Sequence, residues 1–290
     1  MFFLVGSILL SSYLTLSFKV IERYRISTFQ AVVFNYITCA ITGNLLSGDF
    51  VVTSAIHKPW FTWAIIVGLT FITLLNIIGI TAQKISVAVA SVANKLSLVV
   101  PFIFSIFLYD EKVTALKIIG VALALAGVVL TSIQDKHNKV KSAISPVFKS
   151  LLPFILFIGS GLLDTMMKYV QKKYLGSDEN EYSATLFSTA ALIGIIIMPF
   201  YLKIREEKFD KRSILAGICI GIPNYFSIWF LLKVLKQFNN NSTAIIPINN
   251  MGIVLVSSIA AWLMFKESIR FINWIGIAIS ICAIAFIAFG

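Results

Sequence analysis

A lysine lies within a long apolar run, and its chemistry makes it the first candidate functional residue. The run "SVAVASVANKLSLVVPFIFSIF" covers residues 86–107 and contains Lys95. In a membrane-spanning helix this lysine would lie about 14 Å deep in a hydrocarbon core about 30 Å thick. Inserting a lysine there costs about 2.5–3.5 kcal/mol, and such residues almost always face a bundle interior or a wet cavity. We therefore expect Lys95, with Ser91 and Asn94, to face a polar interior.

An ammonium group beside amides and hydroxyls suits the carboxylate or phosphate of a small organic anion or zwitterion. The stretch "IPINN" (246–250) has the same polar character, with Asn249 and Asn250. Broken mid-membrane helices form the binding sites of many carriers, and we expect prolines to break three helices here. These helix-breaking residues are Pro101, Pro223 and Pro247, and the further candidate substrate-binding residues are Ser12, Tyr13, Asn35, Tyr36, Asn76, Asn224, Tyr225 and Trp229. The alternative for each asparagine is an interhelical hydrogen bond, worth about 0.6 kcal/mol.

Asp164 is an acid well inside an apolar run, and Lys168 follows it by one helical turn. The spacing allows an ion pair on one helical face. We interpret the two residues as a charge network or a proton-coupling site. A competing interpretation is that Asp164 and Lys95 only neutralise each other.

The composition predicts an all-α integral membrane protein. Of the 290 residues, 58% are hydrophobic and 13% are charged, against about 25% charged in a soluble domain. Continuous apolar runs of about twenty residues favour helices over a barrel. Ten spans are expected, at residues 2–18, 28–46, 60–82, 86–109, 114–133, 151–174, 183–202, 212–236, 242–265 and 270–289. The net charge of +11 belongs mainly to the short connections, so it does not indicate nucleic-acid binding.

The two halves of the chain resemble each other. Shifting residues 86–120 by 156 places them on residues 242–276, so that Glu111 aligns with Glu267 and Gly120 with Gly276. We predict a first five-helix repeat at 1–134, a basic linker at 135–149 and a second repeat at 150–290. Because five is odd, consecutive units enter the membrane from opposite sides, which makes the repeat inverted.

Ten spans in two repeats, each with a glutamate followed nine residues later by a glycine, resemble the drug/metabolite transporter superfamily, EamA type. The resemblance covers essentially the whole chain and is carried by Pro101, Glu111, Gly120, Gly127, Glu267 and Gly276. It implies that helices 1–4 and 6–9 surround a central cavity, with helices 5 and 10 packed outside. Two positions depart from the family pattern, because Ser257 stands where a second proline would fall and Asn35 stands near a common arginine.

These patterns together predict a secondary transporter that moves a small organic metabolite by alternating access. A flippase for a lipid-linked intermediate is the alternative, and a membrane enzyme or a channel is less favoured. No catalytic residues, metal or cofactor are expected, because His57 and His137 fall in connections and no nucleotide-binding motif occurs. The expected partners are a small-molecule substrate and the lipid bilayer, with a monomer or a homodimer both possible.

The basic residues are divided unequally between the two sides of the membrane. Connections 1–2, 3–4, 5–6, 7–8 and 9–10 hold 15 of the 24 Lys and Arg residues, and the alternate connections hold 8. We call the richer side the basic side. The charge rule places it in the cytoplasm, with both termini outside, whereas the family resemblance implies termini inside. The simplest expected location is a bacterial inner membrane.

Overall fold

The computed structural model describes residues 2–47, 55–109, 114–133, 146–170, 173–174, 179–237, 242–267 and 269–289, and the regular elements within them are helices. The helices are α1 (Phe2–Arg23), α2 (Thr28–Ser47), α4 (Phe61–Lys84), α5 (Val87–Leu96), α6 (Val99–Tyr109), α7 (Ala115–Ser132), α8 (Pro146–Val170), α9 (Glu179–Arg205), α10 (Arg212–Gln237), α11 (Ser242–Phe265) and α12 (Phe271–Phe289). Glu111 and most of the predicted linker 135–149 lie outside the described residues.

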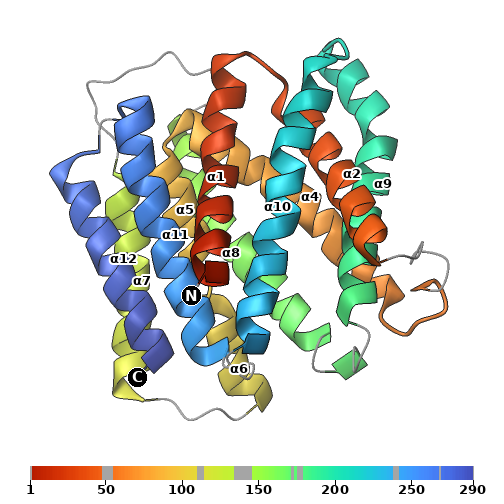
Figure 1. Cartoon of the computed structure of the whole chain (residues 1–290). Coiled ribbons are helices and arrows are strands. Elements are labelled where there is room, and N and C mark those ends of the chain that lie inside the picture. The colour runs from red at the N-terminus through yellow and green to blue at the C-terminus, as the bar shows by residue number, and fades with distance from the viewer. Residues whose placement is uncertain are drawn as a thin grey trace. The chain divides into compact units, whose positions relative to one another are not determined.

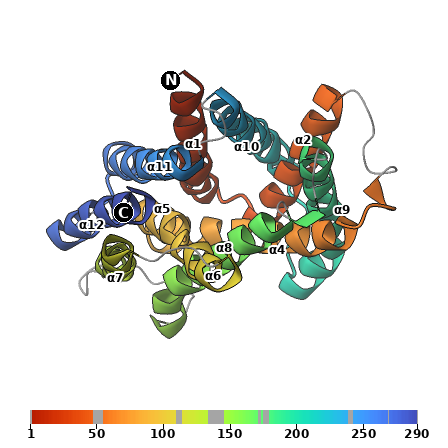
Figure 2. The same cartoon turned by 90° about the horizontal axis from the view of Figure 1, so that it is seen from below.

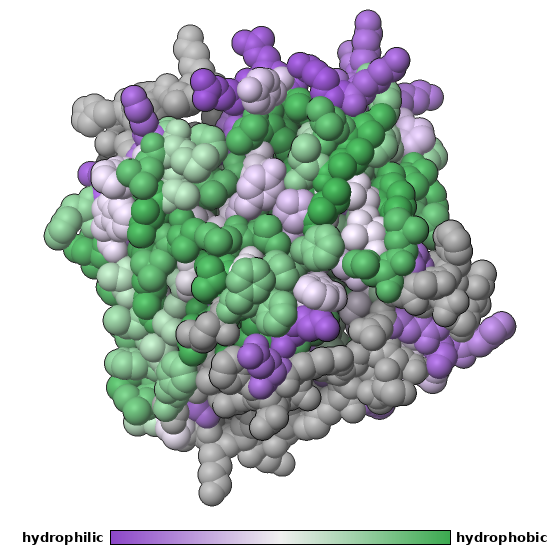
Figure 3. All heavy atoms as spheres, viewed as in Figure 1, coloured by the Kyte–Doolittle hydropathy of each residue, from purple (hydrophilic) through white to green (hydrophobic). Residues whose placement is uncertain are grey.

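The ten predicted spans all correspond to helices of the structure. Eight stretches are long and apolar enough to cross a membrane, one of them made jointly by α5 and α6. The shorter apolar helices α7 and α12 supply the other two. Apolar side chains cover much of the visible helix surfaces, and hydrophilic side chains gather near helix ends (Figure 3). The expected all-α membrane fold is therefore confirmed.

The chain divides into two compact units. Unit 1 comprises Met1–Lys19, Ile77–Leu162 and Ser227–Gly290, and unit 2 comprises Val20–Asn76 and Leu163–Phe226. Each unit takes segments from both halves of the chain, so the units do not follow the predicted repeat boundaries.

In unit 1, α7 and α12 pack along each other through small residues, beside α5 and α11 (Figures 1 and 2). A Cβ atom added at Gly127 would lie 2.5 Å from Ser280 Oγ, and one at Gly276 would lie 2.7 Å from the backbone nitrogen of Thr131. Such distances leave no room for a side chain, so the glycines allow the two backbones to approach closely.

In unit 2, α2 packs against α9 (Figure 1) and against α10. Gly217 and Gly221 of α10 face α2, where an added Cβ atom would lie 2.9 Å from Asn35 N and 2.7 Å from Asn35 O respectively. The GxxxG pattern in α10 therefore serves helix packing, as its spacing predicts.

Candidate functional site

The fourth span is interrupted next to Lys95. Helix α5 ends at Leu96 and α6 begins at Val99, with a turn between them. In this turn Val100 N donates to Ser97 O (2.9 Å), and the Ser97 hydroxyl donates to Asn94 O. Pro101 lies in the first turn of α6, and because it has no N–H it cannot donate to the carbonyl four residues before it. The interruption thus precedes the proline.

The other two expected helix breaks do not occur. Helix α10 continues through Pro223 and α11 continues through Pro247. Ser257 of α11 takes the place of Pro101 in the repeat, and its hydroxyl donates to Ile253 O (2.6 Å) one turn earlier. A serine keeps its backbone N–H, so no backbone hydrogen bond is lost at this place of the ninth span, and α11 stays continuous although it also contains Pro247.

Lys95 lies in the last turn of α5 and is half-buried. A cation is favourable there because the helix C-terminus carries a partial negative charge. Ser91, one turn earlier, is buried, and so is Asn249 of α11, which packs against α5. Among the described residues, Ser91 Oγ and Asn249 Oδ1 have no hydrogen-bond partner. Buried polar atoms without a partner cost about 1–3 kcal/mol each, so each of these two atoms calls for an explanation, and a bound ligand is one.

The sequence did not single out Ser160 of α8, which lies beside this interruption. Its neighbour Gly161 packs on the turn, since an added Cβ atom would lie 2.7 Å from Ser97 O. Ser160 is 4% exposed, and its Oγ has no hydrogen-bond partner among the described residues. The only signal for it was the alignment of its Ser-Gly pair with Ser11 and Ser12 in the first span.

The remaining candidate residues of unit 1 differ in their neighbours and in their exposure. The buried Ser12 hydroxyl lies 3.5 Å from Ile253 O of α11, whereas Tyr13 is exposed. Asn94 and Asn250 are half-buried. The Trp229 ring packs edge-on against Phe3 and lies under the ammonium of Lys233, 5.0 Å from its centroid.

In unit 2, two candidate asparagines bond to each other. Asn224 Nδ2 of α10 donates to Asn35 Oδ1 of α2 (3.1 Å), and both side chains are buried. The Cys39 thiol donates to Gly221 O (3.3 Å) one turn away. For this pair the structure shows the interhelical hydrogen bond that was the alternative to substrate binding. Asn35 Nδ2 has no partner within the described part of the chain.

The other candidates of unit 2 also have neighbours within it. The Tyr36 hydroxyl donates to Phe71 O (3.0 Å), and Asn76 Nδ2 donates to Ile72 O (2.8 Å) in its own helix. Tyr225 packs against Phe187, with ring centroids 6.2 Å apart. These contacts hold α2, α4, α9 and α10 together.

Asp164 and Lys168 are both exposed on the part of α8 that belongs to unit 2. Lys95 belongs to unit 1, so its pairing with Asp164 stays a prediction, as does the role of the two α8 residues in proton coupling. In the described ranges, no group of three His, Cys, Asp or Glu residues is placed to hold a metal ion.

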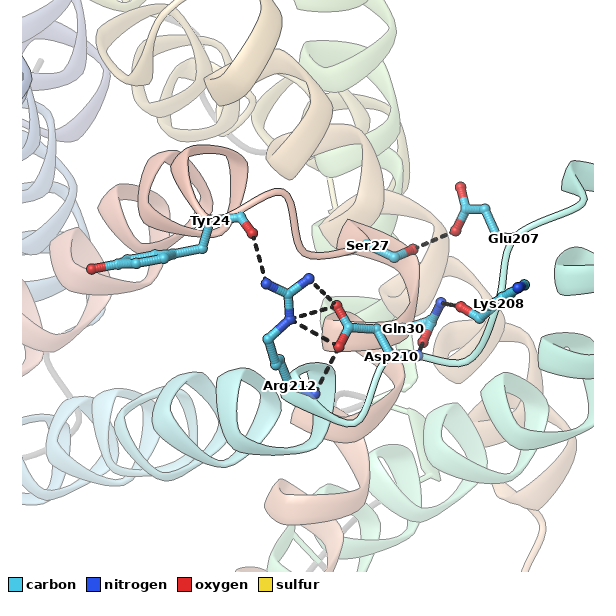
Figure 4. Close-up of polar contacts among 7 residues, drawn as sticks. All are labelled: Tyr24, Ser27, Gln30, Glu207, Lys208, Asp210 and Arg212. Atoms are coloured by element: carbon cyan, nitrogen blue, oxygen red, sulfur yellow. Dashed lines mark hydrogen bonds and ion pairs between the residues drawn. The ribbon is translucent and has the colours of Figure 1, made fainter.

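A polar network joins two connections of unit 2 on the basic side (Figure 4). The buried Gln30 side chain donates to Lys208 O (3.1 Å) and accepts from Asp210 N (2.9 Å). Arg212 donates to the Asp210 carboxylate, and these hydrogen bonds lower the pKa of Asp210. The Ser27 hydroxyl donates to Glu207 (2.8 Å). The start of α2 therefore holds the connection between α9 and α10.

Comparison with known proteins decides the family. Residues 147–289 match the sequence model of the EamA-like transporter family. The chain belongs to this family. A protein of Haemophilus influenzae, described as uncharacterized, is 30% identical over 97% of this chain and 95% of its own. A protein of known crystal structure has a TM-score of 0.62 at 15% identity, over 98% of this chain and 94% of that one, and so shares the fold.

Members of the EamA family are transporters of the drug/metabolite superfamily. This EamA-family chain is accordingly a multi-pass integral membrane protein and a transporter of small molecules.

Proposed function

We propose that this EamA-family transporter carries a small organic anion or zwitterion, such as an amino acid or an organic acid. The observation that carries the proposal is the interruption of the fourth span after Leu96, the residue that follows Lys95. The half-buried ammonium there can meet a carboxylate or a phosphate. Ser91 and Asn249 offer buried polar atoms that have no partner elsewhere in the described residues.

Alternating access is the mechanism that we propose for this transport. Its support is the internal repeat of the sequence, because inverted repeats are typical of carriers that expose one site to each side in turn. A bacterial inner membrane is the proposed location, and the similarity to a Haemophilus influenzae protein supports it.

Counterflow in proteoliposomes tests the proposal. The panel contains amino acids, organic acids, sugar phosphates and cationic dyes, and the parent protein is compared with Lys95→Ala. We expect saturable exchange of an anion or a zwitterion that Lys95→Ala abolishes while the variant stays folded. Lys203→Ala removes an exposed lysine in the last turn of α9 and is the matched control, expected to transport normally.

Two results would contradict the proposal. Normal transport by Lys95→Ala would show that the ammonium does not meet the substrate. Selective exchange of cationic dyes by the parent protein would assign the opposite substrate charge.

A further inference from the structure

The N-terminus of α5 is bound by a carboxylate from the end of α11. Val87 N donates to Glu267 Oε1 and Oε2, each at 3.2 Å. Ser86 precedes the helix as its N-cap, and its Oγ accepts from Val89 N (3.4 Å). A helix N-terminus has unpaired N–H groups and a partial positive charge, so a carboxylate stabilises it. Glu267 therefore holds this end of α5.

Lys19 of α1 adds an ion pair to the same carboxylate. Its Nζ lies 3.5 Å from Glu267 Oε1, and it donates to Gln83 O (3.1 Å) at the end of α4. Gln83 Nε2 in turn donates to Phe18 O (3.0 Å). The Lys19 and Glu267 side chains are only 19% and 10% exposed. All of these residues belong to unit 1, and we call Lys19, Gln83, Val87 and Glu267 the α5 clamp.

The turn after α11 directs Glu267 toward α5. Lys266 has a φ of 51°, which is the left-handed conformation that commonly ends a helix. Glu267 follows immediately, at the start of the connection between the ninth and tenth spans. By the order of the spans, this connection and the chain after Lys19 both lie on the basic side of the membrane.

Helix α5 can transmit movement at the clamp to the proposed substrate site. It is a rod of ten residues, about 15 Å long, and the turn at Ser97 and Leu98 separates it from α6. Ser91, Asn94 and Lys95 all lie on this short rod. Because the clamp holds its other end, a displacement of Glu267 from Val87 would displace the three residues together.

We propose that Glu267, with Lys19, is a positioning residue that couples closure of the transporter on the basic side to the position of Lys95. The inference rests on the proposed function for the role of Lys95. A charge-assisted hydrogen bond at the end of a helix can act as a switch. Its loss shifts the equilibrium between two conformations of the folded protein and does not unfold either of them. Opening on the basic side would separate Glu267 from Lys19 and release α5.

A thiol-accessibility assay tests the coupling without a substrate. Ser91→Cys provides the reporter, and Cys219→Ala and Cys282→Ala remove the two exposed thiols while the buried Cys39 stays. A membrane-impermeant maleimide is added on the basic side of oriented vesicles. Glu267→Gln keeps an acceptor oxygen but loses the ion pair, and we expect labelling about three- to tenfold faster at an unchanged unfolding temperature. Lys19→Gln should act in the same direction.

The control is Glu181→Gln, which removes the ion pair of Glu181 with Lys58 (3.8 Å) in unit 2 and should leave labelling unchanged. The exchange Lys19→Glu with Glu267→Lys restores an ion pair but places an ammonium at the α5 N-terminus, so labelling should remain fast. Slow labelling in this double variant would overturn the role of the helix terminus.

Two further results would overturn the proposal. One is labelling of Glu267→Gln at the parent rate with a lowered unfolding temperature, which would make the clamp a static support. The other is an equal acceleration by Glu181→Gln. Since this assay contains no substrate and the counterflow assay does not involve Glu267, the failure of either proposal is distinguishable from the failure of the other.

Discussion

Asparagine side chains that look alike in the sequence have different partners in the folded chain. Asn76 bonds a carbonyl of its own helix, and Asn35 and Asn224 bond each other across two helices. Asn249 is buried, and its Oδ1 has no partner among the described residues. At the residue scale, an asparagine whose oxygen stays unpaired is the better candidate for ligand binding, because a paired amide would first have to give up its protein partner.

The pair of Asn35 and Asn224 should show a measurable coupling energy. In a double-mutant cycle with Asn35→Ala and Asn224→Ala, we expect a coupling of about 0.6 kcal/mol, and at most about 1.7 kcal/mol, in the free energy of unfolding. Each single change removes the hydrogen bond between the two amides, so the double variant should lose less than the sum of the single variants. Detergent-unfolding titrations measure the three variants. Asn76→Ala combined with Asn224→Ala is the control, expected to be additive, and additivity of the first pair would contradict the bond.

At the element scale, the fourth span is interrupted and the ninth is continuous, although each contains a proline. Pro101 accompanies an interruption between α5 and α6, and Ser257 at the corresponding place leaves α11 continuous. The short α5 then becomes a separate piece that carries Lys95 at one end and meets Glu267 at the other. The ninth span has no such separate piece, because α11 is one helix from Ser242 to Phe265.

The contact between α7 and α12 predicts that Gly276→Ala destabilises the protein. An added Cβ atom would lie 2.7 Å from the backbone nitrogen of Thr131, and backbone cannot move aside as a flexible side chain can. We expect a loss of about 1–3 kcal/mol, as for overpacked interiors. A lowered unfolding temperature in detergent would show it. Ala126→Leu, on the exposed face of α7, is the control, and a stability of Gly276→Ala equal to that of the parent would refute the packing.

At the scale of the whole molecule, the two compact units are not the two halves of the sequence. Four helices, α1, α4, α8 and α10, contribute residues to both units, because the unit boundaries fall inside them. Each unit therefore combines parts of both predicted repeats. The distribution of the basic residues depends on the order of the spans and not on the two units, since these residues concentrate in every second connection.

The charge distribution predicts the orientation. A cysteine introduced by Lys208→Cys, in the exposed connection between α9 and α10, marks the basic side. The charge rule predicts that an impermeant thiol reagent labels it only from the cytoplasm, with both termini outside. Labelling of intact cells and of inverted vesicles measures this directly. Labelling from the outer face of intact cells would instead support the orientation that the family resemblance implies.

The sequence by itself determined the ten spans and the GxxxG spacing of α10. These features depend on the length of apolar runs and on helical spacing, both of which are local. The tertiary structure decided that the break falls at Ser97 and Leu98, that Asn35 pairs with Asn224 from 189 residues away, and that Glu267 holds the α5 N-terminus. A polar group takes whichever partner the fold brings within about 3 Å, and the spacing of residues along the chain does not contain that distance.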